Sequence, residues 1–300
     1  MSAHDFLPWR GAPHEGLQAM RRAVLSGVLL VLASASAHAA IPASERAALL
    51  ALYASTNGSA WVDDTGWGGA AGSECNWYGI VCNGDESQVT EIRLDSNGLS
   101  GTLPPISDFT GLVWFDVSFN DVTGPVPDLL AMPQLQFAFL GVNQLSGPLP
   151  PLSGHPNLEL LDLQLNQLSG TIPALDAMPA LRVLSVRANH LVGGLPSFAG
   201  LATLETFDAA YNELTGPVPS LADLLALKRL RINDNQLVGV MPTPPNPTTL
   251  EAGASQLCPN HLDAVANAVW DTATGQVPWH QDCTPLPDMI FENGFDPEPI

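Results

Sequence analysis

The stretch Leu158-Glu-Leu-Leu-Asp-Leu-Gln-Leu-Asn166-Gln-Leu-Ser-Gly-Thr-Ile-Pro173 decides the fold, because its pattern returns along the chain with constant spacing. An asparagine recurs every 23 residues, at Asn97, Asn120, Asn143, Asn166, Asn189, Asn212 and Asn235. A glycine follows each asparagine by four residues, and a proline follows it by seven. Seven units therefore fill residues 89–249, and their two fixed slots account for seven of the 26 glycines and seven of the 27 prolines.

The spacing of the leucines within one unit predicts a stacked coil. Leu161 and Leu163 alternate as in a short strand with its core face inward, and Leu158 and Leu168 fill the same core from the flanking turns. One unit cannot bury this core alone, so the units must stack, and their strands then form a parallel sheet with about 4.8 Å between strands. The asparagine amide can satisfy backbone groups of neighbouring coils that would otherwise be buried without partners.

The form L-S/T-G-x-I/L/V-P resembles the plant-type subclass of leucine-rich repeats, which also occurs in bacterial exported proteins. Upstream, the stretches Glu45 to Trp61, Gly66-Trp67 and Cys75 to Cys82 are similar to the N-terminal cap of that subclass. The resemblance covers about residues 43–249. It implies an α/β solenoid, a right-handed curved coil with a parallel β-sheet on its concave face and an irregular or 3-10 convex side.

Composition limits the class of partner. The chain has 300 residues, of which 46% are hydrophobic and 13% charged, and its formal net charge is −20. Its only lysine is Lys228. Nucleic acids and anionic membranes bind through clustered cations, so neither is an expected partner.

The N-terminal segment has the pattern of a secretory signal. Arg21 and Arg22 precede an apolar run, and the small residues after it end in Ala37-His-Ala39, which is a typical cleavage site. Residues 1–39 are therefore predicted to be a signal peptide, with Met20 as the true start. No later apolar stretch reaches the length of about 18 residues that a membrane span needs. We expect a secreted protein, either extracellular or periplasmic.

The four cysteines lie outside the repeats, and geometry selects one of their three pairings. Seven coils separate the two ends by about 30 Å, whereas a disulfide requires Cα atoms within about 7 Å. Cys75 is thus predicted to pair with Cys82, and Cys258 with Cys283, so that each bridge staples a cap. A zinc site is disfavoured because neither pair has enough further ligands nearby, and we expect no metal or cofactor.

These boundaries divide the remaining chain into an N-terminal cap (40–88), the seven repeats (89–249), a C-terminal cap (250–283) and a flexible acidic tail (284–300). Each cap must cover the exposed end of the core. Aromatic side chains are available for this purpose at both ends, and we interpret the tryptophans as lids rather than as ligand platforms: Trp61, Trp67, Trp77, Tyr78, Trp270 and Trp279.

Aromatic side chains gather at concave positions of the second and third units. Residues at the third, fifth, seventh and eighth positions of each unit are expected to face outward from the sheet. Apolar patches on soluble proteins mark interaction surfaces, so we predict a binding face anchored by Trp114, Phe119, Phe137 and Phe139. The alternative is that these side chains tuck against the sheet and need no partner. Tyr211 is a further candidate at an eighth position.

Three acids occupy the fifth position. Asp116 should pair with Arg93 and Asp208 with Arg231 in adjacent coils, each as an exposed ion pair. Asp162 has no such neighbour, so it is the concave carboxylate predicted to be available to a partner's cation or hydroxyl. The alternative, and the commoner outcome for such a residue, is a solvated surface aspartate without a partner.

Catalysis is not expected. The chain carries no nucleophile elbow, metalloprotease or P-loop motif, and the histidines after residue 39 are expected on separate loops, as solvated side chains: His155, His190, His261 and His280. The leading prediction is a secreted, monomeric, non-catalytic recognition module that binds a protein or peptide on its concave face. The resemblance agrees, because plant-type repeats occur in receptor ectodomains and in polygalacturonase-inhibiting proteins. A glycan-binding or adhesive module and a structural envelope spacer remain alternatives.

Overall fold

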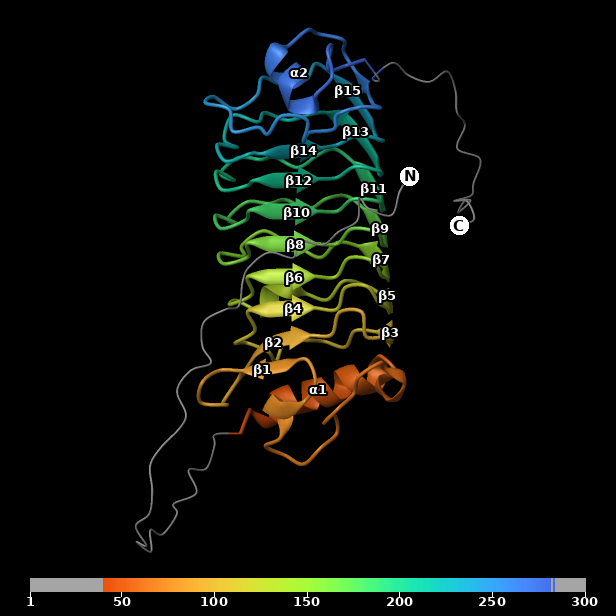
Figure 1. The fold of residues 1–300 in the computed structure, drawn as a ribbon, viewed down its shortest axis with the longest axis vertical. Helices are drawn as coiled ribbons and strands as arrows, with labels where there is room; N and C mark the ends of the chain where they lie inside the picture. The colour runs from red at the N-terminus through yellow and green to blue at the C-terminus, as the bar shows by residue number, and fades with distance from the viewer. Residues whose placement is uncertain (1–39, 282, 284–300) are drawn as a thin grey trace, which may run out of the picture. The chain divides into compact units, whose positions relative to one another are not determined.

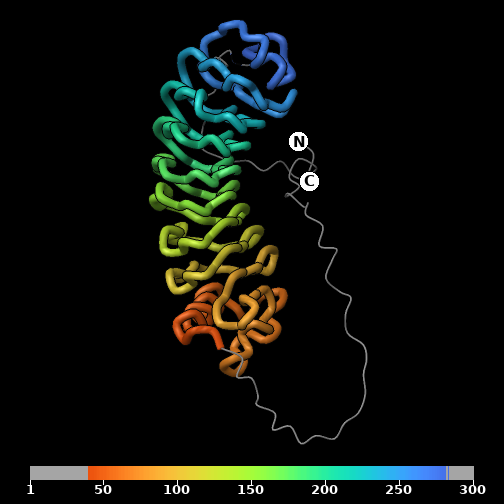
Figure 2. Tube along the Cα trace, turned by 90° about the vertical axis from the view of Figure 1, so that its left-hand side faces the viewer, coloured from red at the N-terminus to blue at the C-terminus, as the bar shows by residue number. Residues whose placement is uncertain are grey.

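The computed structural model describes residues 40–281 and residue 283, all within one compact unit (Figure 1). The predicted signal peptide and the predicted acidic tail lie outside the described residues. The described chain coils upward from an N-terminal cap to a C-terminal cap, one coil upon the next (Figure 2). This arrangement is the predicted solenoid of 23-residue units.

One strand from each unit joins an eight-stranded sheet, which we call the concave sheet. All neighbouring strands are parallel except the first pair, which is antiparallel, and partners in adjacent repeats lie 23 residues apart, as for Leu160 and Val183. The strands in spatial order are β1 (Ile80–Cys82), β2 (Val89–Arg93), β4 (Trp114–Asp116), β6 (Phe137–Phe139), β8 (Leu160–Asp162), β10 (Val183–Ser185), β12 (Thr206–Asp208) and β14 (Arg229–Arg231).

A second parallel sheet, which we call the lateral sheet, runs along another side of the same coils (Figure 1). Its strands follow the asparagine of each unit, and in each repeat the glycine four residues after that asparagine has a positive φ, such as 75° at Gly170. The repeat pattern predicted no strand here, so this sheet is an addition to the predicted architecture. Its strands are β3 (Ser100–Thr102), β5 (Asp121–Gly124), β7 (Gln144–Pro148), β9 (Gln167–Gly170), β11 (His190–Gly193), β13 (Glu213–Pro217), β15 (Gln236–Gly239) and β16 (His261–Leu262).

The return segments between the two sheets are irregular, as predicted, with a 3-10 turn at η4 (Leu129–Ala131). The core between the sheets contains Leu158, Leu161, Leu163 and Leu168, all of them fully buried. This confirms the inward positions that the leucine spacing predicts.

The recurring asparagines form a ladder that ties each coil to the one before it. The Oδ1 of Asn166 accepts a hydrogen bond from the backbone N–H of Leu145 at 2.9 Å. Its Nδ2 donates to the carbonyls of Leu140 and Leu163, at 3.0 and 3.1 Å. Asn260 continues the ladder beyond the repeats, accepting from the N–H of Leu237 at 3.0 Å. Because Asn260 follows the last repeat asparagine by 25 residues rather than 23, the constant spacing did not reveal it.

A helix lies in the segment at each end of the repeats. The N-terminal cap contains α1 (Ala43–Ser55), η2 (Gly58–Ala60) and η3 (Glu74–Asn76), and the C-terminal cap contains α2 (Ala268–Thr274). Disulfides join Cys75 to Cys82 and Cys258 to Cys283. The five predicted lid tryptophans are all buried in the core cluster, as expected of lids. Tyr78, also predicted to cover the N-terminal end, is 41% exposed and does not do so.

Candidate binding face on the concave sheet

Three of the predicted anchor residues form one aromatic cluster on the concave sheet, which we define as Trp114, Phe137 and Phe139. Strand β4 carries Trp114, and the adjacent strand β6 carries both phenylalanines. Phe137 and Phe139 are two residues apart, so their side chains lie on the same face of the sheet. The ring centroid of Trp114 lies 4.9 Å from that of Phe137 and 5.0 Å from that of Phe139. All three side chains are half-buried, so they pack on one another and still present apolar surface.

The fourth predicted anchor, Phe119, does not join this cluster. Strand β4 ends at Asp116, and Phe119 lies in the following turn with a φ of 55°. Its ring makes no stacking contact with the other aromatic rings of the described chain, and its side chain remains 39% exposed. The structure therefore divides the predicted anchors into a three-residue cluster and a separate exposed ring.

The left-handed conformation of Phe119 is a property of the repeat. The eighth residue of every unit has a positive φ between 52° and 57°, and none of them is glycine: Ser96, Phe119, Val142, Leu165, Ala188, Tyr211 and Asp234. Such a conformation costs of the order of 1 kcal/mol in an L residue, and most of all in a β-branched one. Backbone hydrogen bonds between coils hold it, for example from the N–H of Phe119 to the carbonyl of Gly141 at 3.0 Å.

Arg93 has partners other than the predicted one. Its guanidinium lies over the Trp114 ring, 4.5 Å from the centroid, and its Nε donates to the Glu91 carboxylate at 2.7 Å. The predicted ion pair between Arg93 and Asp116 is not formed. Asp116 instead accepts hydrogen bonds from the N–H and the hydroxyl of Ser118, at 3.0 and 2.7 Å. The cation–π contact and the nearer acid on the same strand compete successfully for the guanidinium.

The three acids at the fifth position share a local structural role. Each carboxylate accepts the backbone N–H two residues ahead and so closes the turn that ends its strand, at 3.0 Å for Ser118, 3.0 Å for Gln164 and 3.1 Å for Ala210. Asp162, predicted to be free, also accepts from the Nε2 of Gln164 at 3.0 Å. It forms no ion pair with any residue in the described part of the chain, so it lacks a cation but not hydrogen bonds.

Burial raises the pKa of all three carboxyls. The pKa of Asp162 rises from its ordinary value of 3.8 to about 6 because of burial, and the nearby charges of Asp208 and Asp116 raise it further against the lowering effect of Gln164. Burial also raises the pKa of Asp116, although Ser118 and Arg93 oppose the shift. The pKa of Asp208 is raised in the same way and is opposed by Ala210, Arg187 and Arg231.

The second predicted pair, Asp208 with Arg231, is present at 3.6 Å, but it is not exposed, because the Asp208 side chain is only 7% accessible. Tyr211 belongs to the same end of the sheet, where the guanidinium of Arg187 lies 4.3 Å from the centroid of its ring. Tyr211 is thus on the sixth coil and apart from the aromatic cluster of coils two and three.

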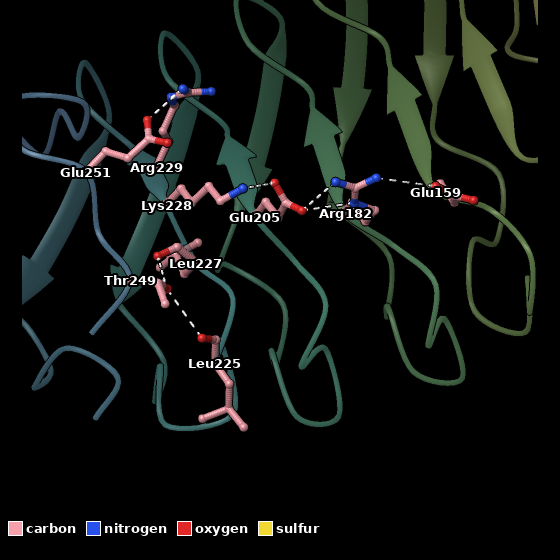
Figure 3. A network of polar contacts seen from close by, with 9 residues as sticks. All are labelled: Glu159, Arg182, Glu205, Leu225, Leu227, Lys228, Arg229, Thr249 and Glu251. Carbon is pink, nitrogen blue, oxygen red and sulfur yellow. Dashed lines mark hydrogen bonds and ion pairs between the residues drawn. The ribbon is translucent and has the colours of Figure 1, made fainter. Parts of the chain in front are cut away.

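A ladder of alternating charges, missed in the sequence, follows the edge where the chain enters the concave sheet (Figure 3). Arg182 contacts Glu205 at 2.6 Å and Glu159 at 3.7 Å, and Lys228 contacts Glu205 at 2.6 Å. One coil further on, Arg229 pairs with Glu251 at 2.6 Å. The sequence contained a signal for this ladder, because acids and bases alternate at the second position of successive units: Glu159, Arg182, Glu205, Lys228 and Glu251. The ladder neutralises much of the small basic content of the chain.

His155 is buried, contrary to the expected solvated loop position. It occupies the place that Met132 and Met178 fill in the adjacent coils, and its Nε2 is buried without a hydrogen-bond partner. Burial lowers the pKa of this imidazole, while Asp128 has the opposite effect. His190 and His261 lie at the first residues of β11 and β16 rather than on loops.

Within residues 40–281 and 283, no three His, Cys, Asp or Glu side chains gather in a group that could hold a metal ion. Among the same residues, no helix has the length and apolar character needed to cross a bilayer.

The chain is similar in sequence to plant receptor kinases over short segments. No protein-family model matches it. A 111-residue segment is 35% identical to "Receptor protein kinase WSS1" of Oryza sativa subsp. japonica, covering 36% of this chain and 11% of that protein. A 66-residue segment is 36% identical to "LRR receptor-like serine/threonine-protein kinase GSO2" of Arabidopsis thaliana, covering 22% of this chain and 5% of that protein. The chain thus spans only a small part of these relatives.

Solved structures with the same fold include plant receptor ectodomains. The plant peptide hormone receptor RGFR1 in complex with RGF2 superposes with a TM-score of 0.56 and 26% identity, over 64% of this chain and 31% of that chain. The LRR ectodomain of the receptor kinase SOBIR1 from Arabidopsis thaliana superposes with a TM-score of 0.51 and 28% identity, over 60% of this chain and 99% of that chain.

Proposed function

We propose that this plant-type leucine-rich-repeat protein is an exported, non-catalytic recognition module that binds a peptide or an extended protein segment along its concave sheet. The observation that carries the proposal is the aromatic cluster of Trp114, Phe137 and Phe139 on the open face of β4 and β6. Apolar surface of this kind on a soluble protein favours an interaction site. The similarity to a peptide hormone receptor in complex with RGF2 supports the same class of ligand.

The surroundings of the cluster support a polymeric ligand rather than a small molecule. Leu160 on β8 and Val183 on β10 continue the column that Trp114 and Phe137 begin, so half-buried apolar side chains extend across four adjacent strands. At about 4.8 Å per strand this column is roughly 15 Å long, which matches four or five residues of extended peptide. The disulfides and the predicted signal peptide agree with a location outside the cytoplasm.

Selection from a displayed random-peptide library tests the proposal. Wild-type protein should enrich peptides whose binding is lost in the Trp114→Ala and Phe137→Ala variants. Leu225→Ala is the matched control, because Leu225 is 51% exposed on the return segment between β13 and β14, outside the concave sheet. It should retain binding.

Other outcomes of the selection contradict the proposal in distinguishable ways. Peptides that bind all three variants equally would place the site elsewhere on the molecule. Saturable binding on a glycan array, lost in Trp114→Ala, with no peptide enrichment, would favour the glycan-binding module. Failure of both screens would favour the structural spacer.

A further inference from the structure

Two carboxylates frame one ring of the aromatic cluster. In the register of the concave sheet, Phe139 is the partner of Asp116 on one side and of Asp162 on the other. Adjacent strands are about 4.8 Å apart, so the two acids lie about 10 Å from each other with the Phe139 ring between them. A group placed over that ring meets a carboxylate on either side.

Neither acid of this frame is neutralised by the protein. Asp116 and Asp162 form no ion pair with any described residue, and Arg93, the nearest base to Asp116, is held by Glu91 and the Trp114 ring. The other charges that act on Asp162 are those of Asp116 and Asp208, which are also negative. Half-buried carboxylates without an ion-pair partner are unfavourable in the free protein, and a cation from a partner would reduce that cost.

The backbone of the preceding coil approaches Asp162 closely at a glycine. Gly141 lies in the seventh-position column between Ser118 and Gln164, and a Cβ at this glycine would approach the Oδ2 of Asp162 to 3.1 Å. The same Cβ would also lie 3.1 Å from the Cγ of Gln164, so only glycine lets the Asp162 carboxylate and the Gln164 side chain lie this close to the strand of Phe139. In the other coils of the described chain this column carries a side chain at every position: Asp95, Ser118, Gln164, Arg187, Ala210 and Asn233.

We propose that the ligand inserts a lysine or arginine side chain over the Phe139 ring, between Asp116 and Asp162, with apolar neighbours on the rest of the aromatic cluster. This inference rests on the proposed function and specifies its ligand as a basic, amphipathic peptide segment. A cation over an aromatic face and beside carboxylates gains both a cation–π contact and ionic hydrogen bonds. An acidic ligand would instead meet two uncompensated carboxylates, and a single metal ion could not bridge acids about 10 Å apart.

The test uses three short peptides that differ only in charge. The probe is acetyl-Leu-Arg-Leu-Arg-Leu-amide carrying a fluorophore, and its matched forms contain citrulline, a neutral analogue of arginine, or glutamate in place of arginine. Fluorescence anisotropy with the oxidised full-length mature protein gives the Kd of each peptide. We expect the citrulline peptide to bind at least tenfold more weakly than the arginine peptide and the glutamate peptide more weakly again.

Variants of the frame then assign the effect to the two acids. Asp116→Asn and Asp162→Asn keep an oxygen for the turn N–H and remove the charge, and Asp162→Asn also replaces the second oxygen, which accepts from the Nε2 of Gln164. Each should weaken the arginine peptide about tenfold without changing the affinity of the citrulline peptide, and Gly141→Ala should weaken the arginine peptide by crowding Asp162. Asp176→Asn removes the same charge from an exposed acid on the return segment after β9, so it controls for attraction by the overall net charge and should have little effect.

The peptide affinities distinguish a wrong cation site from a wrong binding face. Equal affinities for the arginine and citrulline peptides, both lost in Phe137→Ala, would overturn the cation site while leaving the binding face intact. The same would follow if Asp176→Asn matched Asp162→Asn in its effect. Peptides that bind equally well to wild-type protein and to Phe137→Ala would refute the binding face itself.

Discussion

Replacing the Asp162 carboxylate by an amide, in Asp162→Asn, is expected to stabilise the fold at neutral pH. Burial without a countercharge raises the pKa of this group from 3.8 to about 6. Each unit of pKa difference between folded and unfolded states corresponds to about 1.4 kcal/mol, so the charge destabilises the folded state by at most about 3 kcal/mol. Because Asp162 keeps some solvent access, we expect a gain of about 1 to 2 kcal/mol.

The pH dependence has a definite sign. The folded state holds a proton on Asp162 at pH values where the unfolded state has already lost it, between about 4 and 6. The penalty from this group is therefore complete above about pH 6, declines as the pH falls, and vanishes below about pH 4. The advantage of Asp162→Asn should follow the same course.

Urea unfolding monitored by circular dichroism at pH 7.5, 5.5 and 4 measures this advantage as a difference in unfolding free energy. Taking the difference from wild type at each pH removes the part of the Asp116 and Asp208 contributions that does not depend on the Asp162 charge. Asp176→Asn should show no comparable trend. The reasoning is refuted if Asp162→Asn is less stable than wild type at pH 7.5, or if its advantage is the same at all three pH values.

Three further predictions concern the rest of the solenoid. His155→Met should raise Tm, and more at pH 5.5 than at pH 7.5, because the lowered pKa of the buried imidazole costs stability as the pH falls below its ordinary value of 6.5; an equal rise at both would contradict this. Asn189→Ala should lower the unfolding free energy by about 1 to 3 kcal/mol, since it strands the buried N–H of Leu168, whereas the carbonyl of Leu163 keeps its hydrogen bond from Asn166; the exposed neighbour Gln167→Ala should be nearly neutral in the same urea titration. Arg182→Ala should cost less than about 1 kcal/mol, because its ion pairs are half exposed, and a larger loss would show that the charge ladder acts cooperatively.

Much of the candidate site could be predicted because the repeat assigns each residue to a column. The pairing of Trp114 with Phe137 follows from their separation of 23 residues, as does the position of Asp162 beside Phe139. The spacing does not predict which of several neighbouring groups a side chain contacts. Arg93 had Asp116, Glu91 and Trp114 within reach, and the structure selects the last two.

Backbone geometry accounts for the other differences. The eighth-position residues were expected to project from strands, yet each lies in a turn with a positive φ, which no residue type at that position announces. His155 was expected in solvent, because a lone histidine in a Pro- and Gly-rich segment has no local signal of burial. Its place between Met132 and Met178 follows from the stacking of coils.

The sequence by itself determined the periodic features: the coil length, the inward leucines, the asparagine ladder, the cap disulfides and the columns of the concave sheet. In a strict repeat the same residue types occupy the same positions of every coil, so the backbone and core packing of one coil apply to all seven. The tertiary structure alone decided the non-periodic features, namely the lateral sheet, the partners of the arginines and the burial of Asp208 and Asp162. These depend on which neighbouring coil supplies a hydrogen bond, a ring or a charge, and that competition is settled only when the coils are stacked.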